Sequence, residues 1–250
     1  MRRALMMCLI RGGTLIVLLA ASPAFALAGV RETVKEFESG KNRITVDCFA
    51  PTAKGTFPLV LLLHGSGGLQ GFTHDGFKAV ARNLASKGYV TLIPHLFDHE
   101  GGEEQYKDVV KDTIAFAIES GVVDEERIGI IGLSMGAYLA MTQADADPRV
   151  KAIVSVSGSA PTELPPRFPP TLILHGSHDE ITPVSNVKKA EVLFKEKKIP
   201  CEVHIYARTG HNLDVPKFLD AGRRSGVFFD KYLKPAKTPP KGEKPLTPPR

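Results

Sequence analysis

The chain has 250 residues, of which 43% are hydrophobic and 24% are charged, with 32 basic and 27 acidic side chains. This length suits a single sizeable α/β domain. The composition is close to the average of globular proteins, which argues against wholesale disorder and against a membrane protein with many spans.

Residues 1–28 have the pattern of a secretory signal peptide: basic residues precede an apolar run at 15–21, and small residues follow at 26–28. We expect cleavage after Ala28, or alternatively after Ala26, and therefore an exported protein, periplasmic or secreted. A retained membrane anchor is the other interpretation. It would need ~20 predominantly apolar residues, whereas glycines and a proline interrupt this stretch, so no stable membrane insertion is expected after cleavage.

The predicted leader contains three arginines and no acidic residue, so the remainder of the chain has a formal charge of +2. Residues 235–250 contribute four basic residues and one acidic residue, which leaves the body at 29–234 near −1. Such a body carries no electrostatic footprint for nucleic acid. The tail at 235–250 is rich in proline and lysine and is predicted to be disordered, with docking to a surface as the alternative role.

From Thr33 to Leu233, short apolar runs alternate with amphipathic ones, which predicts strands and helices taking turns around a mostly parallel sheet with helices on both faces. Strands are expected at 33–38, 43–49, 58–63, 89–94, 127–133, 150–156, 171–174 and 202–206. Helices are expected at 75–87, 103–119, 135–144, 186–198 and 215–233.

Two connections refine this picture. The first two strands flank the turn-rich residues 39–42, which favours an antiparallel edge hairpin. The connection at 157–170 is short and holds five prolines, so it leaves no room for a large cap domain. We therefore expect an open site on a domain that spans 29–234.

The sharpest motif is Gly-Leu-Ser-Met-Gly at 132–136, between a predicted buried strand and a predicted helix. A serine on such a cramped turn projects its hydroxyl from the edge of the sheet, and the glycines avoid collisions with neighbouring backbone. Ser134 is therefore the candidate nucleophile, and a tight turn with an idle serine is the alternative. The helix that follows presents free N–H groups to developing negative charge, so the N–H of Met135 is one expected oxyanion donor.

A second oxyanion donor is expected in the glycine-rich segment 64–68, which follows a buried strand at the same edge. Glycines let a backbone approach a ligand closely. We assign this role to the N–H of Ser66, with Gly67 as the fallback. His64 fits a structural position at the end of its strand better than a catalytic one.

A serine nucleophile needs a base and an acid, which follow it in the chain if the order is nucleophile, acid, base. Asp179 follows one strand and His211 follows the next, so both lie on loops at the carboxyl edge of the sheet, where open parallel folds bind ligands. We predict Asp179 as the acid and His211 as the base. The weaker candidates are Glu180 or Asp214 as acid and His178 or His204 as base.

The segments 64–68, 123–136, 174–179 and 210–211 together resemble the dienelactone hydrolase family, over about residues 33–233. The resemblance implies a three-layer α/β-hydrolase fold and hydrolase activity.

The nucleophile, acid and base of that family fall on Ser134, Asp179 and His211. Dienelactone hydrolase proper has a cysteine nucleophile where this chain has serine, so its substrate does not carry over. Nor does an arginine occupy a matching position for that enzyme's carboxylate substrate; Arg208 lies near His211 at a different offset.

These observations predict a serine hydrolase that cleaves a carboxylic ester or related acyl bond in a small molecule through an acyl-enzyme, with no cofactor and no metal. A peptidase or an acyltransferase with the same triad is the alternative within enzymes. A non-catalytic domain of the same fold that binds a ligand is the alternative from another class.

Overall fold

The computed structural model describes residues 29–98, 101–159 and 161–234. The predicted signal peptide at 1–28 and the predicted tail at 235–250 lie outside the described residues, so both stay predictions. None of the helices in the described part of the chain combines the length and apolar character that a membrane span requires.

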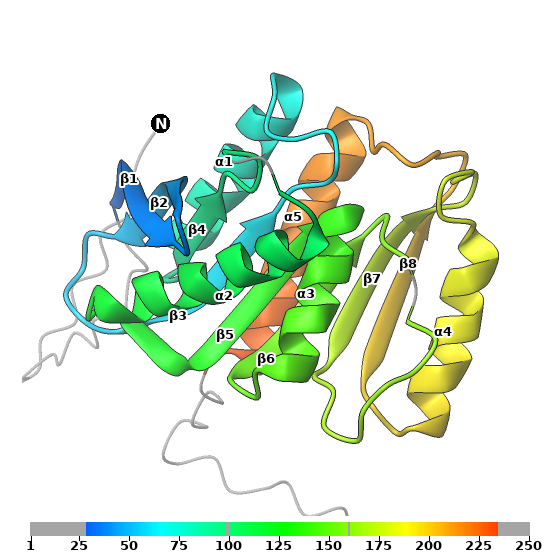
Figure 1. The fold of residues 1–250 in the computed structure, drawn as a ribbon. Helices are drawn as coiled ribbons and strands as arrows, with labels where there is room; N and C mark the ends of the chain where they lie inside the picture. The colour runs from blue at the N-terminus through cyan, green and yellow to red at the C-terminus, as the bar shows by residue number, and fades with distance from the viewer. Residues whose placement is uncertain (1–28, 99–100, 160, 235–250) are drawn as a thin grey trace, which may run out of the picture.

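The described residues form an eight-stranded sheet and five helices (Figure 1). The strands are β1 (Val30–Ser39), β2 (Asn42–Pro51), β3 (Phe57–Leu63), β4 (Val90–Pro94), β5 (Val123–Leu133), β6 (Val150–Val156), β7 (Thr171–Gly176) and β8 (Cys201–Tyr206). The helices are α1 (Phe72–Ser86), α2 (Glu103–Glu119), α3 (Met135–Ala146), α4 (Val184–Glu196) and α5 (Val215–Tyr232).

The strand order is β1-β2-β4-β3-β5-β6-β7-β8. β1 and β2 form the predicted antiparallel hairpin at one edge, and β2 joins β4 in antiparallel register, whereas β4, β3 and all later strands run parallel to one another. Parallel strands that are buried on both faces are made of nearly continuous aliphatic residues, as in β3 and β4. The mostly parallel sheet predicted from the sequence is confirmed.

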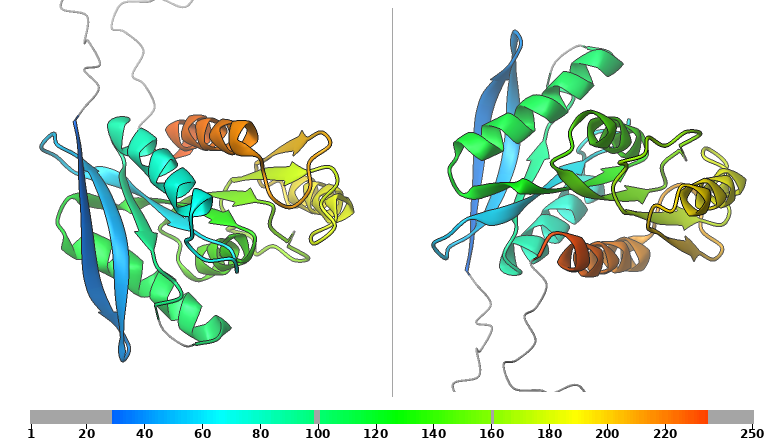
Figure 2. Two further views of the ribbon diagram at one scale, coloured as in Figure 1. Left: turned by 90° about the horizontal axis from the view of Figure 1, so that it is seen from above. Right: turned by 90° about the horizontal axis from the view of Figure 1, so that it is seen from below.

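Two apolar cores lie on opposite faces of the sheet. One core packs α2, α3 and α4 against the sheet, and the other packs α1 and α5 against the opposite face, as the views from above and below show (Figure 2). The result is the predicted three-layer arrangement with helices on both faces. The described residues of the connection 157–170 contain no helix or strand.

The predicted elements recur with shifted ends. The largest extension is in β5, which begins at Val123 because Val123 and Asp124 pair with Phe57 and Pro58 before the register shifts. Charged residues at 125–127 interrupt the apolar run, so the hydrophobic pattern marks only the second part of this strand.

Candidate active site

Ser134 lies on the turn between β5 and α3, with φ 54° and ψ −114°. Its N–H donates to the carbonyl oxygen of Val156 at 2.9 Å, which ties the turn to β6. The two glycines of the motif are required by contact. A Cβ on Gly132 would lie 2.2 Å from the carbonyl oxygen of Gly136, and one on Gly136 would lie 2.2 Å from that of Leu63. The crowded backbone therefore holds Ser134 in a conformation that non-glycine residues seldom adopt.

His211 and Asp179 converge on this serine from the loops after β8 and β7. The hydroxyl of Ser134 lies 2.9 Å from Nε2 of His211, and Nδ1 of His211 lies 2.9 Å and 3.1 Å from the two carboxylate oxygens of Asp179. The arrangement fits an imidazole that donates its Nδ1–H to Asp179 and accepts the serine proton at Nε2. The structure thus brings the three residues predicted from the sequence together in one hydrogen-bonded line.

The side chain of Asp179 is fully buried and accepts further hydrogen bonds from its own loop. The N–H groups of Ile181 and Thr182 donate to it at 3.0 and 2.8 Å, and the hydroxyl of Thr182 donates at 2.8 Å. Burial opposes ionisation, but the hydrogen bonds from Thr182 and His211 outweigh it and hold the pKa of Asp179 below its usual value. Asp179 is therefore an anion that can orient His211.

The weaker candidates do not join this line. Glu180 and His178 are exposed, and the ring of His204 packs edge-on against that of Tyr206. Asp214 instead caps the N-terminus of α5, where its side chain accepts a backbone N–H.

The segment 64–68 forms a turn in which the N–H of Gly68 donates to the carbonyl oxygen of Gly65 at 3.0 Å. Ser66 and Gly67 are exposed. Together with Ser134 and His211 they line a cavity of about 120 Å³, which we call the site cavity. The predicted oxyanion segment therefore faces the candidate nucleophile.

His64 holds this turn in place, as a structural residue would. Its Nε2 accepts the N–H of Leu96 at 3.1 Å, so the proton lies on Nδ1 and donates to the carbonyl oxygen of Gly65 at 2.8 Å. Burial lowers the pKa of His64, which keeps the ring neutral and able to make both bonds.

Comparison with known proteins agrees with this geometry. The family model described as the dienelactone hydrolase family matches residues 99–218, which include all three residues of the hydrogen-bonded line. The relative named "Putative carboxymethylenebutenolidase" from Methylorubrum extorquens is 26% identical over 192 residues, which span 64% of this chain and 65% of that protein. The chain is a member of the dienelactone hydrolase family. The alignment covers just under two thirds of that relative's length.

Solved structures agree on the fold. The dienelactone hydrolase of Anabaena variabilis superposes with a TM-score of 0.64 at 20% identity, covering 82% of this chain and 99% of that one. An acylaminoacyl peptidase from Pyrococcus horikoshii superposes with a TM-score of 0.66 at 16% identity, covering 84% of this chain and 43% of that one. One fold therefore serves both a dienelactone hydrolase and a peptidase.

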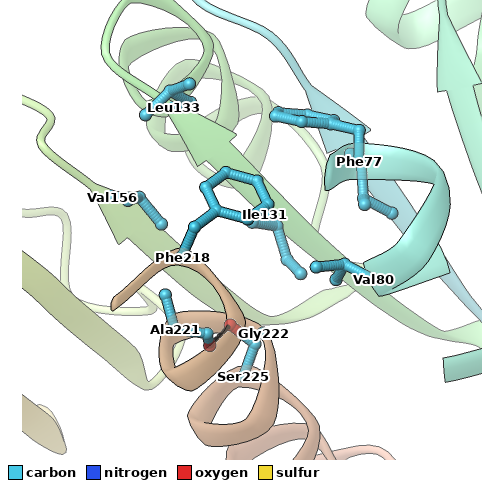
Figure 3. A pocket seen from close by; sticks show the side chains of 10 residues that line it. Phe77, Val80, Ile131, Leu133, Val156, Phe218, Ala221, Gly222 and Ser225 are labelled. Carbon is cyan, nitrogen blue, oxygen red and sulfur yellow. Dashed lines mark hydrogen bonds between the residues drawn. The ribbon is translucent and has the colours of Figure 1, made fainter. Parts of the chain in front are cut away.

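This member of the dienelactone hydrolase family also has a small apolar cavity next to the candidate nucleophile, on the face covered by α1 and α5. Its volume is about 30 Å³. Figure 3 shows the ring of Phe218 projecting from α5 toward β5, with Phe77 of α1 on one side and Val156 on the other. Leu133, which directly precedes Ser134, lines both this apolar cavity and the site cavity. An apolar group bound near Ser134 would meet this wall.

Proposed function

We propose that this chain is an exported serine hydrolase that cleaves a carboxylic ester or a related acyl bond in a small molecule. The observation that carries the proposal is the distance of 2.9 Å between the hydroxyl of Ser134 and Nε2 of His211, with His211 oriented by the buried Asp179. A buried carboxylate, an imidazole and a hydroxyl in this order form the proton-handling line of serine hydrolases.

In the proposed reaction His211 takes the hydroxyl proton of Ser134, and the oxygen attacks the carbonyl carbon of the substrate. The protonated imidazole then gives this proton to the leaving group as the acyl bond breaks, which leaves an acyl-enzyme. Water attacks the acyl-enzyme after losing a proton to His211, and the acid is released as the serine regains a proton.

The oxyanion formed in each step needs hydrogen-bond donors that are already in place. We assign these to the N–H of Met135, at the N-terminus of α3, and the N–H of Ser66. Two observations support this choice: Met135 directly follows the nucleophile, and Ser66 lines the cavity into which Ser134 opens. Gly67 lines the same cavity and is the fallback.

Substrate preference is proposed only as a class. The site cavity is small, and the described residues of the connection 157–170 add no helix or strand over it, which favours small or loosely held acyl groups. A peptidase with the same three residues is the second candidate, favoured by the fold shared with acylaminoacyl peptidase. An acyltransferase and a binding domain without catalysis complete the set that the experiment separates.

Export is part of the proposal and rests on the sequence alone. The basic, apolar and small-residue segments of 1–28 support a cleaved leader, and hence a periplasmic or secreted enzyme. The N-terminal residue of the protein recovered from the producing cells, read by mass spectrometry, tests this directly. A mature chain that begins at Gly29 or Leu27 is expected, and a chain that keeps residues 1–28 would contradict it.

A fluorophosphonate probe tests the hydrolase mechanism. The folded protein is expected to form one covalent adduct on Ser134, located by peptide mass spectrometry, and Ser134→Ala is expected to form none. Turnover of p-nitrophenyl esters, lactones and peptides beside the same variant then identifies the class of bond. Absence of an adduct in folded protein would favour the binding domain, because the chain would then lack an activated serine.

A further inference from the structure

A second group of chemically capable side chains lies outside the catalytic line. Asp47 on β2, His74 in the first turn of α1 and His95 directly after β4 point their ligating atoms at one another, all within 4.8 Å. We call these three residues the His-His-Asp cluster. We propose that the His-His-Asp cluster binds a divalent transition-metal ion, with Zn²⁺ as the best match.

Three elements far apart in the sequence are built to meet here. β2 and β4 are paired, with Asp47 opposite Ile93, and the N–H of His95 donates to the carbonyl oxygen of Thr45 at 2.9 Å. This bond fixes the backbone of His95 beside β2. α1 packs on the same part of the sheet and supplies His74. The cluster is therefore held by the fold and does not depend on a single loop.

The spacing of the ligating atoms suits a small cation. Oδ2 of Asp47 lies 2.6 Å from Nε2 of His74 and 3.2 Å from Nε2 of His95. Bonds from zinc to nitrogen or oxygen are roughly 2.0–2.2 Å, so ligand atoms around tetrahedral zinc lie roughly 3.3–3.6 Å apart. Asp47 and His95 already lie close to that separation, and His74 would have to withdraw by about 0.7 Å.

Burial leaves one side of the cluster open. The side chain of Asp47 is 5% exposed, whereas those of His74 and His95 are 23% and 24% exposed. A cation could therefore enter past the histidines and keep water in its remaining position, as zinc with three protein ligands does. The buried carboxylate also needs a compensating positive charge or donors, and without a metal the two imidazoles act as those donors.

The ligand types select the class of metal. Two imidazole nitrogens and one carboxylate oxygen suit zinc and other late first-row divalent ions, whereas Ca²⁺ and Mg²⁺ prefer sets made only of oxygen ligands. A further carboxylate stands behind the cluster: Oδ1 of Asp98 lies 3.9 Å from Nδ1 of His95, and its other oxygen accepts the N–H of Thr45. A carboxylate behind a ligating histidine orients the ring and strengthens it as a ligand.

The cluster is joined to the segment 64–68 by a short path. His95 is followed by Leu96, whose N–H is held by His64, and His64 in turn holds the carbonyl oxygen of the residue after it. Thr73, which directly precedes the cluster's histidine on α1, lines the site cavity. A bound ion would therefore fix two walls of the site cavity, so its role would be to stabilise and position.

Titration of chelator-stripped protein with Zn²⁺, against a chromophoric competitor, tests the proposal. The wild-type chain is expected to bind one equivalent tightly and to gain thermal stability as zinc is added. His74→Gln and His95→Gln are each expected to weaken binding by more than about 100-fold, because each removes a ligand. Asp98→Asn is expected to weaken it by about 10-fold.

Matched controls locate the ion. His204→Gln removes a histidine outside both sites, and His211→Gln removes the one beside Ser134, and both variants are expected to bind one equivalent as the wild type does. Substitution by Co²⁺ adds a spectroscopic test: the wild type is expected to show the intense visible absorption of a low-coordinate site, and His95→Gln to lose it.

Three results would overturn the proposal: no binding of one equivalent by the wild type, only the weak spectrum of hydrated Co²⁺, or undiminished binding by His74→Gln and His95→Gln. Both glutamine variants keep an amide that can donate to Asp47, so their melting temperatures in chelator are expected to remain near that of the wild type. They decide the question even if Asp47→Asn does not fold.

Discussion

The backbone at Ser134 is locally strained, because φ 54° with ψ −114° lies outside the regions that L residues favour. A position of this kind costs ~1–3 kcal/mol and persists only where the surroundings over-determine it. Here the surroundings are the carbonyl oxygen of Val156, which holds the serine N–H, and the two glycine positions, where any side chain would meet backbone atoms. The same contacts aim the hydroxyl at His211.

The N–H of Ser66 can be removed while the rest of its turn is kept. Ser66 is the second residue of a turn closed by Gly68 and Gly65, a position where proline is favoured. Ser66→Pro therefore removes the N–H with little change to the turn, and it is expected to lower kcat by ~100 to 1000-fold on an ester that the wild type cleaves. Ser66→Ala keeps the N–H and is the matched control, with activity close to wild type. Full activity in Ser66→Pro would assign the role to Gly67.

The three catalytic candidates are predictable from the sequence because each stands at the end of a strand in a recognisable order. Thr182, which donates twice to Asp179, is not among the predicted site residues. An aspartate that accepts from the N–H groups two and three residues later is a local turn pattern, so Asp179 with Thr182 carries a weak signal. The His-His-Asp cluster carries none, since three elements with no shared motif contribute its residues.

At the scale of elements, the alternation of apolar and amphipathic segments predicts every strand and helix that the structure describes, with ends displaced by a few residues. The ends are harder to predict because backbone hydrogen bonding, not hydrophobicity, sets them. α1 begins at Phe72, before its buried face starts at Gly76. β7 continues to Gly176, where a Cβ would lie 2.3 Å from the carbonyl oxygen of Gly210. Such close approaches are visible only in the folded chain.

Helices α1 and α5 together form the wall that limits the apolar cavity, and the ring of Phe218 is the largest part that α5 contributes to it (Figure 3). Phe218→Ala is expected to enlarge the cavity and to raise the ratio of kcat/KM for long-chain over short-chain p-nitrophenyl esters by about 10-fold, since one methylene in a pocket is worth ~1–3 kcal/mol. Leu219→Ala, at the next position and 55% exposed, is the matched control. An unchanged ratio in Phe218→Ala would mean that the acyl chain lies elsewhere.

At the scale of the whole molecule, the strand order explains how distant segments form one site. β3, β5, β7 and β8 run parallel, so the loops that follow them lie along one edge of the sheet. The hairpin of β1 and β2 extends the same sheet and brings Asp47 beside the end of β4. The catalytic line and the His-His-Asp cluster are therefore both products of the sheet, and the segment 64–68 lies between them in the path of hydrogen bonds.

The charge distribution of the whole molecule predicts how its stability depends on pH. Every carboxyl group with a resolved shift in the described residues has a lowered pKa, because donors outweigh any cost of burial. These groups are Glu32, Asp47, Glu103, Asp147, Asp179, Asp214 and Asp220. The folded chain therefore binds fewer protons than the unfolded chain in acid, and the free energy of unfolding must fall as the pH is lowered through this range.

Asp220 on α5 provides the test. Burial opposes its ionisation, but hydrogen bonds from Arg224, Arg223 and Tyr206 lower its pKa to about 2. Its contribution to stability is fully present above the pKa of an unfolded aspartate, ~3.9, and is lost as the pH falls through about 2. Asp220→Asn is expected to be less stable than the wild type by about 1 kcal/mol at pH 6, a modest value because the group is partly exposed. Urea unfolding in chelator, followed by circular dichroism, should show this difference shrinking between about pH 4 and pH 2, whereas a difference that stays constant over that window would contradict the role of the Asp220 carboxylate.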